Sequence, residues 1–241
     1  MCTSNEKPLF KFGLVADVQY GDFDDQWDFT KEHLRHYRQS LVGLGQTVSR
    51  WNEEEVDFAL QLGDIIDGLN SEKGLSEAAL DTVFNQLKDF DKPFHHTFGN
   101  HDLYNFKRSH LLSSRLNSAP ISDKSKSYYS FSPYPGFLII MLDTYSTSML
   151  GLESTDKAYK EAHELLKTKN PNDNLNSPNG LSKHNKRYCK FNGAIDLQQM
   201  TWLNDTLQRA DQRGMHVIVA GMCIPGVYTQ YMSRSRLICL L

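Results

Sequence analysis

The sequence lacks the features that mark several large classes of protein. It has only four cysteines in 241 residues, and none of them forms a CxxC pair, so neither a zinc knuckle nor a disulfide framework is indicated. No apolar run approaches the roughly 18 residues that cross a bilayer, and the first residues contain no apolar stretch of signal-peptide length. We therefore expect a cytoplasmic protein with reduced thiols and no membrane association.

A surplus of positive charge is also absent. Lys and Arg together number 26 and Asp and Glu number 29, which gives a net charge of −3. This balance argues against a general nucleic-acid binder. It leaves a small anionic substrate open, because a bound metal ion can supply positive charge locally. The length and the 39% of apolar residues suit one sizeable α/β domain with a real core, and we expect it to be a monomer.

Apolar runs alternate with helical spacing over the first hundred residues. We expect strands at 10–16, 57–62 and 93–98, and helices at about 28–51 and 76–90, with Leu34 among the residues on the apolar face of the first helix. The rhythm of strand, helix, strand, helix, strand favours a largely parallel sheet covered by helices.

The second half of the sequence has a different pattern. Two strands, at 128–132 and 137–143, predict a hairpin beside the sheet. Residues 170–193 are rich in Asn, Pro, Ser, Lys and Gly and predict a long, mobile surface loop. Asp196 followed by Gln199 predicts a capping box that opens a helix whose apolar side begins at Leu197. A last buried strand is expected at 216–220.

Polar clusters stand directly after the first three strands. In an open α/β sheet the loops beyond the carboxyl ends of the strands share one edge, so these clusters are expected to converge there. Carboxylate and amide oxygens suit Mn²⁺, Mg²⁺ or Fe²⁺, and two such ions can hold and activate a phosphoryl group. Each cluster alone is also compatible with a turn or a helix N-cap. The clusters are Asp17-Val18-Gln19, Gly63-Asp64-Ile65-Ile66-Asp67 and Gly99-Asn100-His101-Asp102.

These motifs, in this order and spacing, resemble those of the calcineurin-like metallophosphoesterases. Within that superfamily the sequence is most similar to the manganese-dependent ADP-ribose/CDP-alcohol diphosphatases, and Gln19, where most of the superfamily has His, is a mark of that branch. The resemblance covers roughly residues 9–221. It is carried by Ala16-Asp17-Val18-Gln19, by Leu62-Gly63-Asp64-Ile65-Ile66-Asp67-Gly68, by His95-His96-Thr97-Phe98-Gly99-Asn100-His101 and by Leu175-Asn176-Ser177-Pro178.

The resemblance implies an activity and a set of roles. The activity would be metal-dependent hydrolysis of the diphosphate bond of ADP-ribose, CDP-choline and related nucleoside diphosphate compounds to two monophosphates, with two divalent ions, Mn²⁺ or alternatively Mg²⁺. Asp17 and Gln19 would bind the first ion, Asp64 would bridge both, and Asn100 would bind the second. His101 would act near the leaving oxygen as an acid or as a transition-state stabiliser.

Three further carboxylates are not assigned as metal ligands. Asp67 and Asp102 would lie behind the site and orient His101 or the metal ligands, although for Asp67 a plain structural role is equally compatible. Asp143 closes the strand that begins at Phe137 and could support the site, but a capping or turn role is preferred.

The resemblance also implies a fold, and the sequence departs from it after Gly221. We expect a metallophosphoesterase-type β-sandwich flanked by helices, with the C-terminal part of the second half missing, so that residues 1–221 form an incomplete domain and residues 222–241 a divergent tail. Met222 stands where the family has a histidine ligand, and no Gly-His-x-His motif follows. Exposed apolar faces and an unpaired sheet edge would result. Two alternatives to the enzyme stay open: a catalytically impaired or inactive truncated form, and a binding domain that works without metal.

Overall fold

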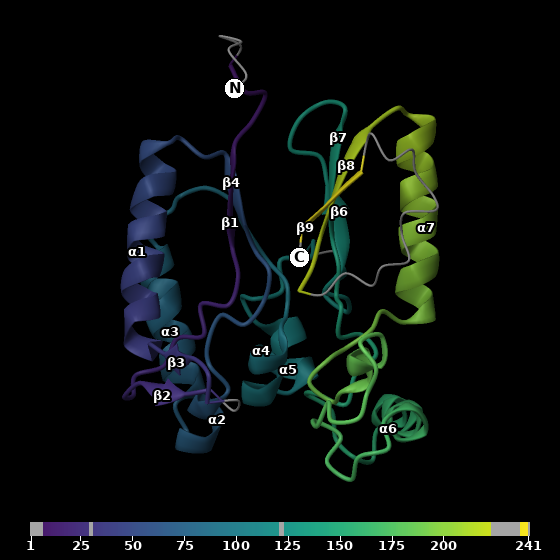
Figure 1. The fold of residues 1–241 in the computed structure, drawn as a ribbon. Helices are drawn as coiled ribbons and strands as arrows, with labels where there is room; N and C mark the ends of the chain where they lie inside the picture. The colour runs from purple at the N-terminus through teal and green to yellow at the C-terminus, as the bar shows by residue number, and fades with distance from the viewer. Residues whose placement is uncertain (1–6, 29–30, 121–122, 223–236, 241) are drawn as a thin grey trace.

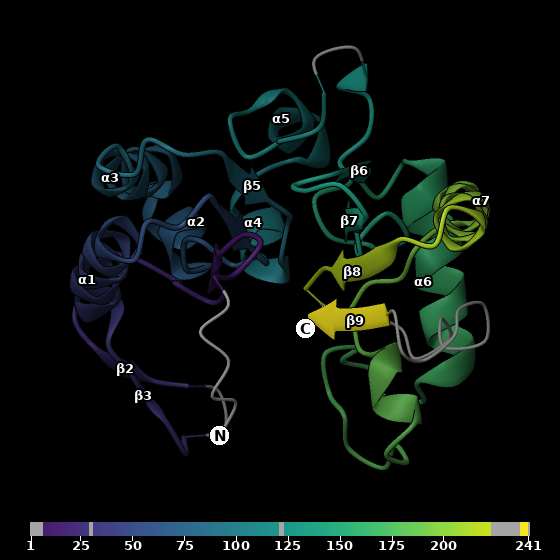
Figure 2. The same ribbon diagram turned by 90° about the horizontal axis from the view of Figure 1, so that it is seen from above.

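The protein is a four-layered α/β sandwich in the computed structural model, which describes residues 7–28, 31–120, 123–222 and 237–240. Two β-sheets lie side by side at the centre, and helices cover the outer side of each (Figure 1). The view from above shows α1 (Tyr37–Glu53) and α3 (Ser76–Leu87) beyond the first sheet and α7 (Leu197–Gln212) beyond the second (Figure 2). The expected helix-flanked sandwich is therefore confirmed. No helix in the described ranges has the length and apolar character needed to cross a bilayer.

The first sheet contains the three strands expected from the first hundred residues. Its order is β1-β4-β5, and both pairings are parallel. The strands are β1 (Phe12–Val15), β4 (Phe58–Gln61) and β5 (Phe94–His96), and the helices that connect and cover them are α1 (Tyr37–Glu53) and α3 (Ser76–Leu87).

The second sheet has the order β6-β7-β8-β9. The predicted hairpin, β6 (Tyr129–Phe131) and β7 (Phe137–Met141), is antiparallel as expected, but it belongs to this second sheet and does not extend the first. The predicted last strand is β8 (His216–Ala220), parallel to β7. The backbone of β9 (Leu237–Leu240) pairs with β8. The prediction of an unpaired sheet edge is therefore wrong for β8. The tail residues 223–236 and 241 lie outside the described residues.

Three apolar clusters correspond to the three interfaces between the layers. Leu60 of β4 and Met141 of β7 are fully buried between the two sheets. Val48 and Val83 represent the cluster beneath α1 and α3, which also contains Ile65. A third cluster packs α7 (Leu197–Gln212) on the outer face of the second sheet. Full burial of a side chain such as Leu60 stabilises the fold by about 1.5–3 kcal/mol.

The prediction for residues 28–51 was wrong at its start. Helix α1 begins only at Tyr37, and the residues before it form the short antiparallel ribbon β2 (Gln26–Trp27) and β3 (Leu34–Arg35). Leu34 is 41% exposed, so it does not belong to a buried apolar face of a helix as predicted. The extended backbone is held by contacts beyond its own neighbours, since Arg35 makes an ion pair with Asp67 at 3.2 Å.

Several elements between the predicted ones were not expected. Helix α6 carries many charges and buries only Ala162 and Leu166, so its apolar spacing is weak. Residues 170–193 contain little regular structure, as predicted, but the Asn170 side chain donates to the carbonyls of Leu175, Ser177 and Tyr188 and ties the segment together. Its mobility stays a prediction. The additional helices are α2 (Leu69–Lys73), α4 (Asn100–Asn105), α5 (Arg108–Ser113), α6 (Lys157–Lys169) and the 3₁₀ helix η2 (Asn185–Tyr188).

The start of α7 shows half of the expected capping box. The Asp196 carboxylate accepts a hydrogen bond from the backbone N–H of Gln199 at 2.8 Å, as predicted. The side chain of Gln199 does not return to the cap but hydrogen bonds to the backbone of Asp143. Leu197 is 81% exposed, so the apolar side of the helix does not include it.

Candidate metal centre

The loops that follow β1 and β4 are joined by backbone hydrogen bonds beyond the ends of the strands. The N–H of Asp17 donates to the Gly63 carbonyl at 3.2 Å, and the N–H of Gln19 donates to the Asp64 carbonyl at 2.9 Å. This pairing places the first two polar clusters side by side at the carboxyl edge of the first sheet, as predicted.

Three of the four predicted metal ligands have a left-handed backbone. The φ angles are +54° at Asp17, +45° at Gln19 and +57° at Asp64. This conformation costs about 1–2 kcal/mol for a residue with a Cβ and is concentrated at functional sites. The strain turns the side chains out of the strand direction and towards one another.

The side chains of the first two clusters meet directly. Gln19 Nε2 lies 3.0 Å from Asp17 Oδ1 and 3.4 Å from Asp64 Oδ2. The third cluster joins them, because the backbone N–H of His101 donates to Asp64 Oδ1 at 2.7 Å. Asn100 precedes His101 at the start of α4.

The donors in these clusters fit a hard cation. They comprise two carboxylates and two amide oxygens, the chemistry that Mn²⁺ and Mg²⁺ accept. The described residues contain no group of three or more His, Cys, Asp or Glu side chains arranged to hold a metal. In the predicted ligand set, Asp17 and Asp64 would supply the negative charge, and the amides of Gln19 and Asn100 would add oxygen donors without charge.

Asp102 lies behind the site and organises its backbone. Its carboxylate accepts from the N–H groups of Asp64 at 2.8 Å, Ile65 at 3.0 Å and Gly99 at 2.8 Å. Burial raises the pKa of Asp102 and also that of Asp64, whose carboxylate is further disfavoured by the charge of Asp102. Two neighbouring buried carboxylates favour a cation at this position.

Gly99 makes the approach of these loops sterically feasible. A Cβ on Gly99 would lie 2.0 Å from Asp64 Oδ1, and its other close neighbour would be the Asp64 backbone nitrogen at 2.6 Å. A side chain larger than hydrogen would therefore displace the carboxylate.

His101, Asp67 and Arg35 form a chain of polar contacts beside the carboxylates. His101 Nδ1 accepts from the Gly68 N–H at 2.8 Å and lies 3.2 Å from Asp67 Oδ2, which is also 3.2 Å from Arg35. Acceptance from Gly68 requires Nδ1 without a proton, so that the neutral ring carries its proton on Nε2, whereas a hydrogen bond to Asp67 requires the proton on Nδ1. Burial lowers the pKa of His101, but the hydrogen bond with Asp67 and the negative charges of Asp64 and Asp67 outweigh it and raise the pKa overall. The sequence offered no signal for Arg35.

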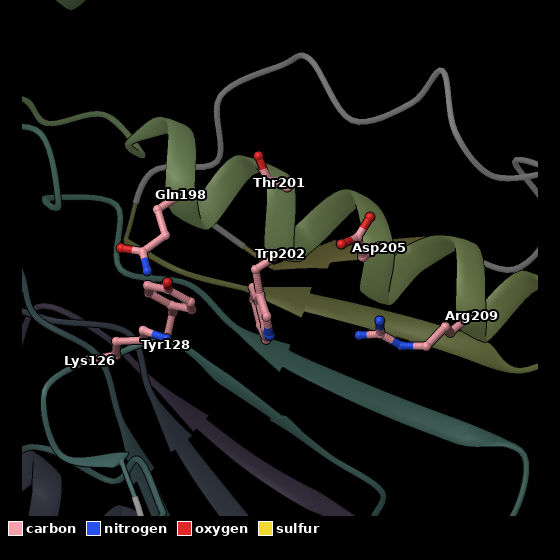
Figure 3. A pocket seen from close by; sticks show the side chains of 7 residues that line it. All are labelled: Lys126, Tyr128, Gln198, Thr201, Trp202, Asp205 and Arg209. Atoms are coloured by element: carbon pink, nitrogen blue, oxygen red, sulfur yellow. The ribbon is translucent and has the colours of Figure 1, made fainter.

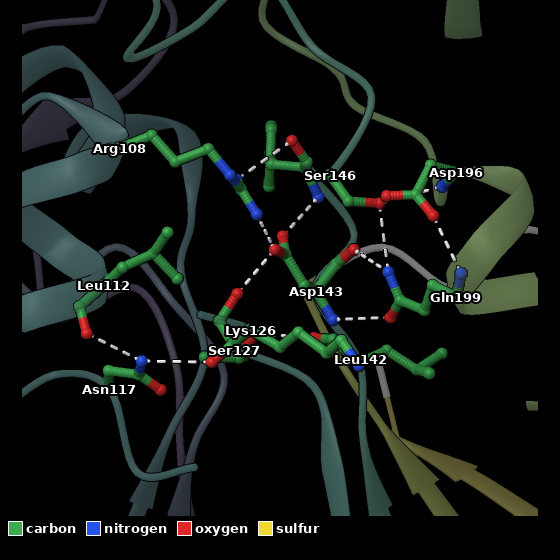
Figure 4. A network of polar contacts seen from close by, with 12 residues as sticks. Arg108, Leu112, Asn117, Lys126, Ser127, Leu142, Asp143, Ser146, Asp196 and Gln199 are labelled. Carbon is green, nitrogen blue, oxygen red and sulfur yellow. Dashed lines mark hydrogen bonds and ion pairs between the residues drawn. The ribbon is translucent and has the colours of Figure 1, made fainter. Parts of the chain in front are cut away.

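Asp143 has both a turn role and a wider one. Its Oδ1 accepts from the Tyr145 N–H at 3.0 Å, which is the predicted turn contact. Its Oδ2 makes an ion pair with Arg108 of α5 and accepts a hydrogen bond from Ser127 Oγ at 2.5 Å. Its backbone N–H donates to the side-chain oxygen of Gln199 of α7 (Figure 4). This buried network connects α5 and α7 to the end of β7 in the second sheet.

Met222 lies beside the candidate site. Its Sδ would be 3.0 Å from a Cβ built on Gly63, the residue before Asp64, and it packs against the cluster that contains Ile65. The position matched to a missing histidine is therefore adjacent to the predicted bridging carboxylate, but it carries a thioether, which is a poor donor for Mn²⁺.

A surface pocket of about 410 Å³ lies elsewhere on the molecule, between α7 and the segment that leads into β6 (Figure 3). The rings of Tyr128 and Trp202 are 4.9 Å apart in it, with Lys126 and Arg209 nearby. None of the predicted site residues lines this pocket. The candidate centre is thus identified by the strand ends and their contacts, not by a surface hollow.

Comparison with known proteins agrees with the geometry. Residues 10–221 match the model of the calcineurin-like phosphoesterase family. The chain belongs to that family. A manganese-dependent ADP-ribose/CDP-alcohol diphosphatase from Mus musculus is 40% identical over 226 residues, and the match covers 88% of this chain and 66% of the mouse protein. The Homo sapiens protein of the same name is 37% identical, with 90% and 67% covered.

A solved structure supports the same relationship. A dimetal phosphatase from Danio rerio superposes with a TM-score of 0.85 at 39% identity, covering 89% of this chain and 70% of that one. The family resemblance drawn from the motifs is therefore confirmed, and so is the fold. The chain spans about two thirds of the length of these curated relatives.

Proposed function

We propose that this phosphoesterase-family chain hydrolyses the diphosphate bond of nucleoside diphosphate compounds such as ADP-ribose, CDP-choline and other CDP-alcohols, in a Mn²⁺-dependent reaction. The observation that carries the proposal is the convergence of Asp17, Gln19 and Asp64, with the N–H of His101 bonded to Asp64. The names of the mouse and human relatives supply the substrate class.

In this proposal the metal ions are bound by Asp17, Gln19, Asp64 and Asn100. When bound, a pair of Mn²⁺ ions would supply Lewis-acid activation of water and neutralise phosphoryl oxygens. His101 would present its Nε2 proton to the leaving oxygen, since its Nδ1 is occupied by the Gly68 N–H. Asp67 and Asp102 would keep His101 and the Asp64 loop in place.

We carry the remaining expectations into the same proposal. Residues 1–221 would form the catalytic domain and 222–241 a divergent tail. The protein would act in the cytoplasm, in agreement with the free thiol of buried Cys189, and as a monomer without nucleic-acid or membrane partners. Size-exclusion chromatography with light scattering tests the monomer.

A second candidate is favoured by one observation, the thioether of Met222 beside Gly63. A centre with four oxygen donors and no histidine would bind Mn²⁺ weakly, so the chain would be a catalytically impaired relative of the diphosphatases. Both candidates share the same fold and the same partial ligand set.

Activity measurements on three proteins separate the two candidates. The wild type, Asp64→Asn and Met222→His are incubated with ADP-ribose and Mn²⁺, and AMP is quantified by chromatography. Turnover by the wild type that Asp64→Asn abolishes supports the enzyme. Wild-type turnover no higher than that of Asp64→Asn, with a gain in Met222→His, supports the impaired form and refutes the first proposal.

A further inference from the structure

The Asn100 carboxamide is held by a tyrosine that the motifs did not identify. Tyr145 follows β7 and is 2% exposed, within the core cluster under the first sheet. Its hydroxyl lies 3.3 Å from Asn100 Oδ1 and 3.2 Å from the carbonyl oxygen of Phe191. The phenol therefore bridges a predicted metal ligand and the segment of residues 170–193.

The position of Tyr145 is fixed by its backbone. Its N–H donates to Asp143 Oδ1 at 3.0 Å, and its carbonyl accepts from Arg108 at 3.2 Å. Gly193 allows the chain to pass close to the ring, since a Cβ there would lie 2.6 Å from Tyr145 Cδ1. A side chain clamped in this way can impose an orientation on Asn100.

The chemistry of the hydroxyl specifies that orientation. A phenol has one proton, so it cannot donate to two carbonyl oxygens at once. Rotating the Asn100 amide by 180° exchanges the positions of its oxygen and nitrogen. The hydroxyl then accepts from Asn100 Nδ2 and donates to Phe191, and both contacts are satisfied.

We propose that Tyr145 is a positioning residue, which accepts a hydrogen bond from Asn100 Nδ2, donates to the Phe191 carbonyl, and so turns Asn100 Oδ1 towards the metal centre. The assignment rests on the proposed function, because Asn100 needs a fixed oxygen only as a ligand.

Calorimetric titration of the full chain with Mn²⁺ is the first test. Tyr145→Phe removes only the hydroxyl and should weaken Mn²⁺ binding about tenfold, as losses behind a metal ligand do. Tyr129→Phe is the matched control, since Tyr129 is also buried and its hydroxyl bonds to His95 at 2.8 Å, away from the proposed ligands. It should bind Mn²⁺ as the wild type does.

A second measurement needs no metal. The side-chain NH₂ of Asn100 is assigned in ¹⁵N-labelled protein by its loss in Asn100→Asp, and its hydrogen exchange is measured. Exchange should be roughly fivefold faster in Tyr145→Phe than in wild type, because one hydrogen bond is lost, and unchanged in Tyr129→Phe.

The two measurements separate this proposal from the proposed function. If wild type binds Mn²⁺, an undiminished affinity in Tyr145→Phe overturns the positioning role. If wild type binds no Mn²⁺, the metal site fails, and the exchange of the Asn100 amide in metal-free protein still decides the direction of the hydrogen bond. Exchange that is unaffected by Tyr145→Phe overturns it.

Discussion

Replacing Asp143 by Asn is expected to destabilise the protein severely although the residue is no predicted ligand. Its side chain is 1% exposed and pairs with Arg108, which is 17% exposed. Burial lowers the pKa of the Arg108 guanidinium to about 10, so it remains charged at pH 7. Asp143→Asn would leave this cation without its counter-ion and Ser127 without its carboxylate acceptor.

The size of the loss follows from the burial of the pair. Removing one partner of a buried ion pair costs about 3–5 kcal/mol, whereas a domain is stable by only about 5–15 kcal/mol. Arg108→Met should cost a similar amount. The double variant Arg108→Met/Asp143→Asn should be less damaged than the sum of the single variants by about 2–3 kcal/mol, because neither charge is then left alone.

Urea unfolding followed by circular dichroism measures these differences. With a slope of about 2–3 kcal/mol/M, a loss of about 4 kcal/mol lowers the midpoint by about 1.3–2 M. A control cycle uses the neighbouring pair Lys107 and Glu153, which are 2.7 Å apart but 71% and 59% exposed. Solvent screening should leave that pair without measurable coupling. Additive costs for Arg108→Met and Asp143→Asn, or equal coupling in the two pairs, would refute the reasoning.

Two further predictions concern burial and close approach. Burial lowers the pKa of His96 to about 3, so the ring stays neutral in the folded protein while the unfolded chain takes up a proton below about pH 6.5. The folded state should therefore lose about 2 kcal/mol of stability between pH 6.5 and 5. His96→Phe should reduce the fall of the urea midpoint over that range, and an unchanged pH dependence would contradict this. Gly99→Ala should lose Mn²⁺ binding in calorimetry, because its Cβ would collide with Asp64 Oδ1. The control Gly43→Ala, whose Cβ would meet nothing within 4 Å, should bind Mn²⁺ as the wild type does. Retained binding in both variants would show that the close approach of Gly99 to Asp64 is not required.

The strand ends were predictable because their signals are local. An apolar run such as that of β4, followed at once by Gly63 and Asp64, specifies both a buried strand and a polar turn at its end. The rule that parallel strands share one carboxyl edge then brings Asp17, Asp64 and Asn100 together without further information. Tertiary structure was required only to show that the backbone at Asp17 and Asp64 is left-handed.

The contacts that support the site from outside the motifs were not predictable in the same way. Gln199 was expected to cap its own helix, since the local pattern fits a capping box. It bonds instead to Asp143, which is 56 residues away in the sequence. Arg35 was placed in a helix, but its partner Asp67 holds it in a strand. Propensity is a weak prior, and a buried partner at long range overrides it.

The predicted ligands are held in place by contacts within the protein, whereas a metal ion would interact with the ligands themselves. Asp102 bonds three backbone N–H groups of the loops around Asp64, and these bonds exist among protein atoms alone. The strained geometry is therefore supported by contacts within the fold. The ion is favoured by charge, because burial raises the pKa of Asp64 and a cation would oppose that shift. The affinity for Mn²⁺ should consequently depend on the number of side chains that donate to the ion. Met222, beside Gly63, is the position where one substitution tests that dependence without disturbing the contacts of Asp102.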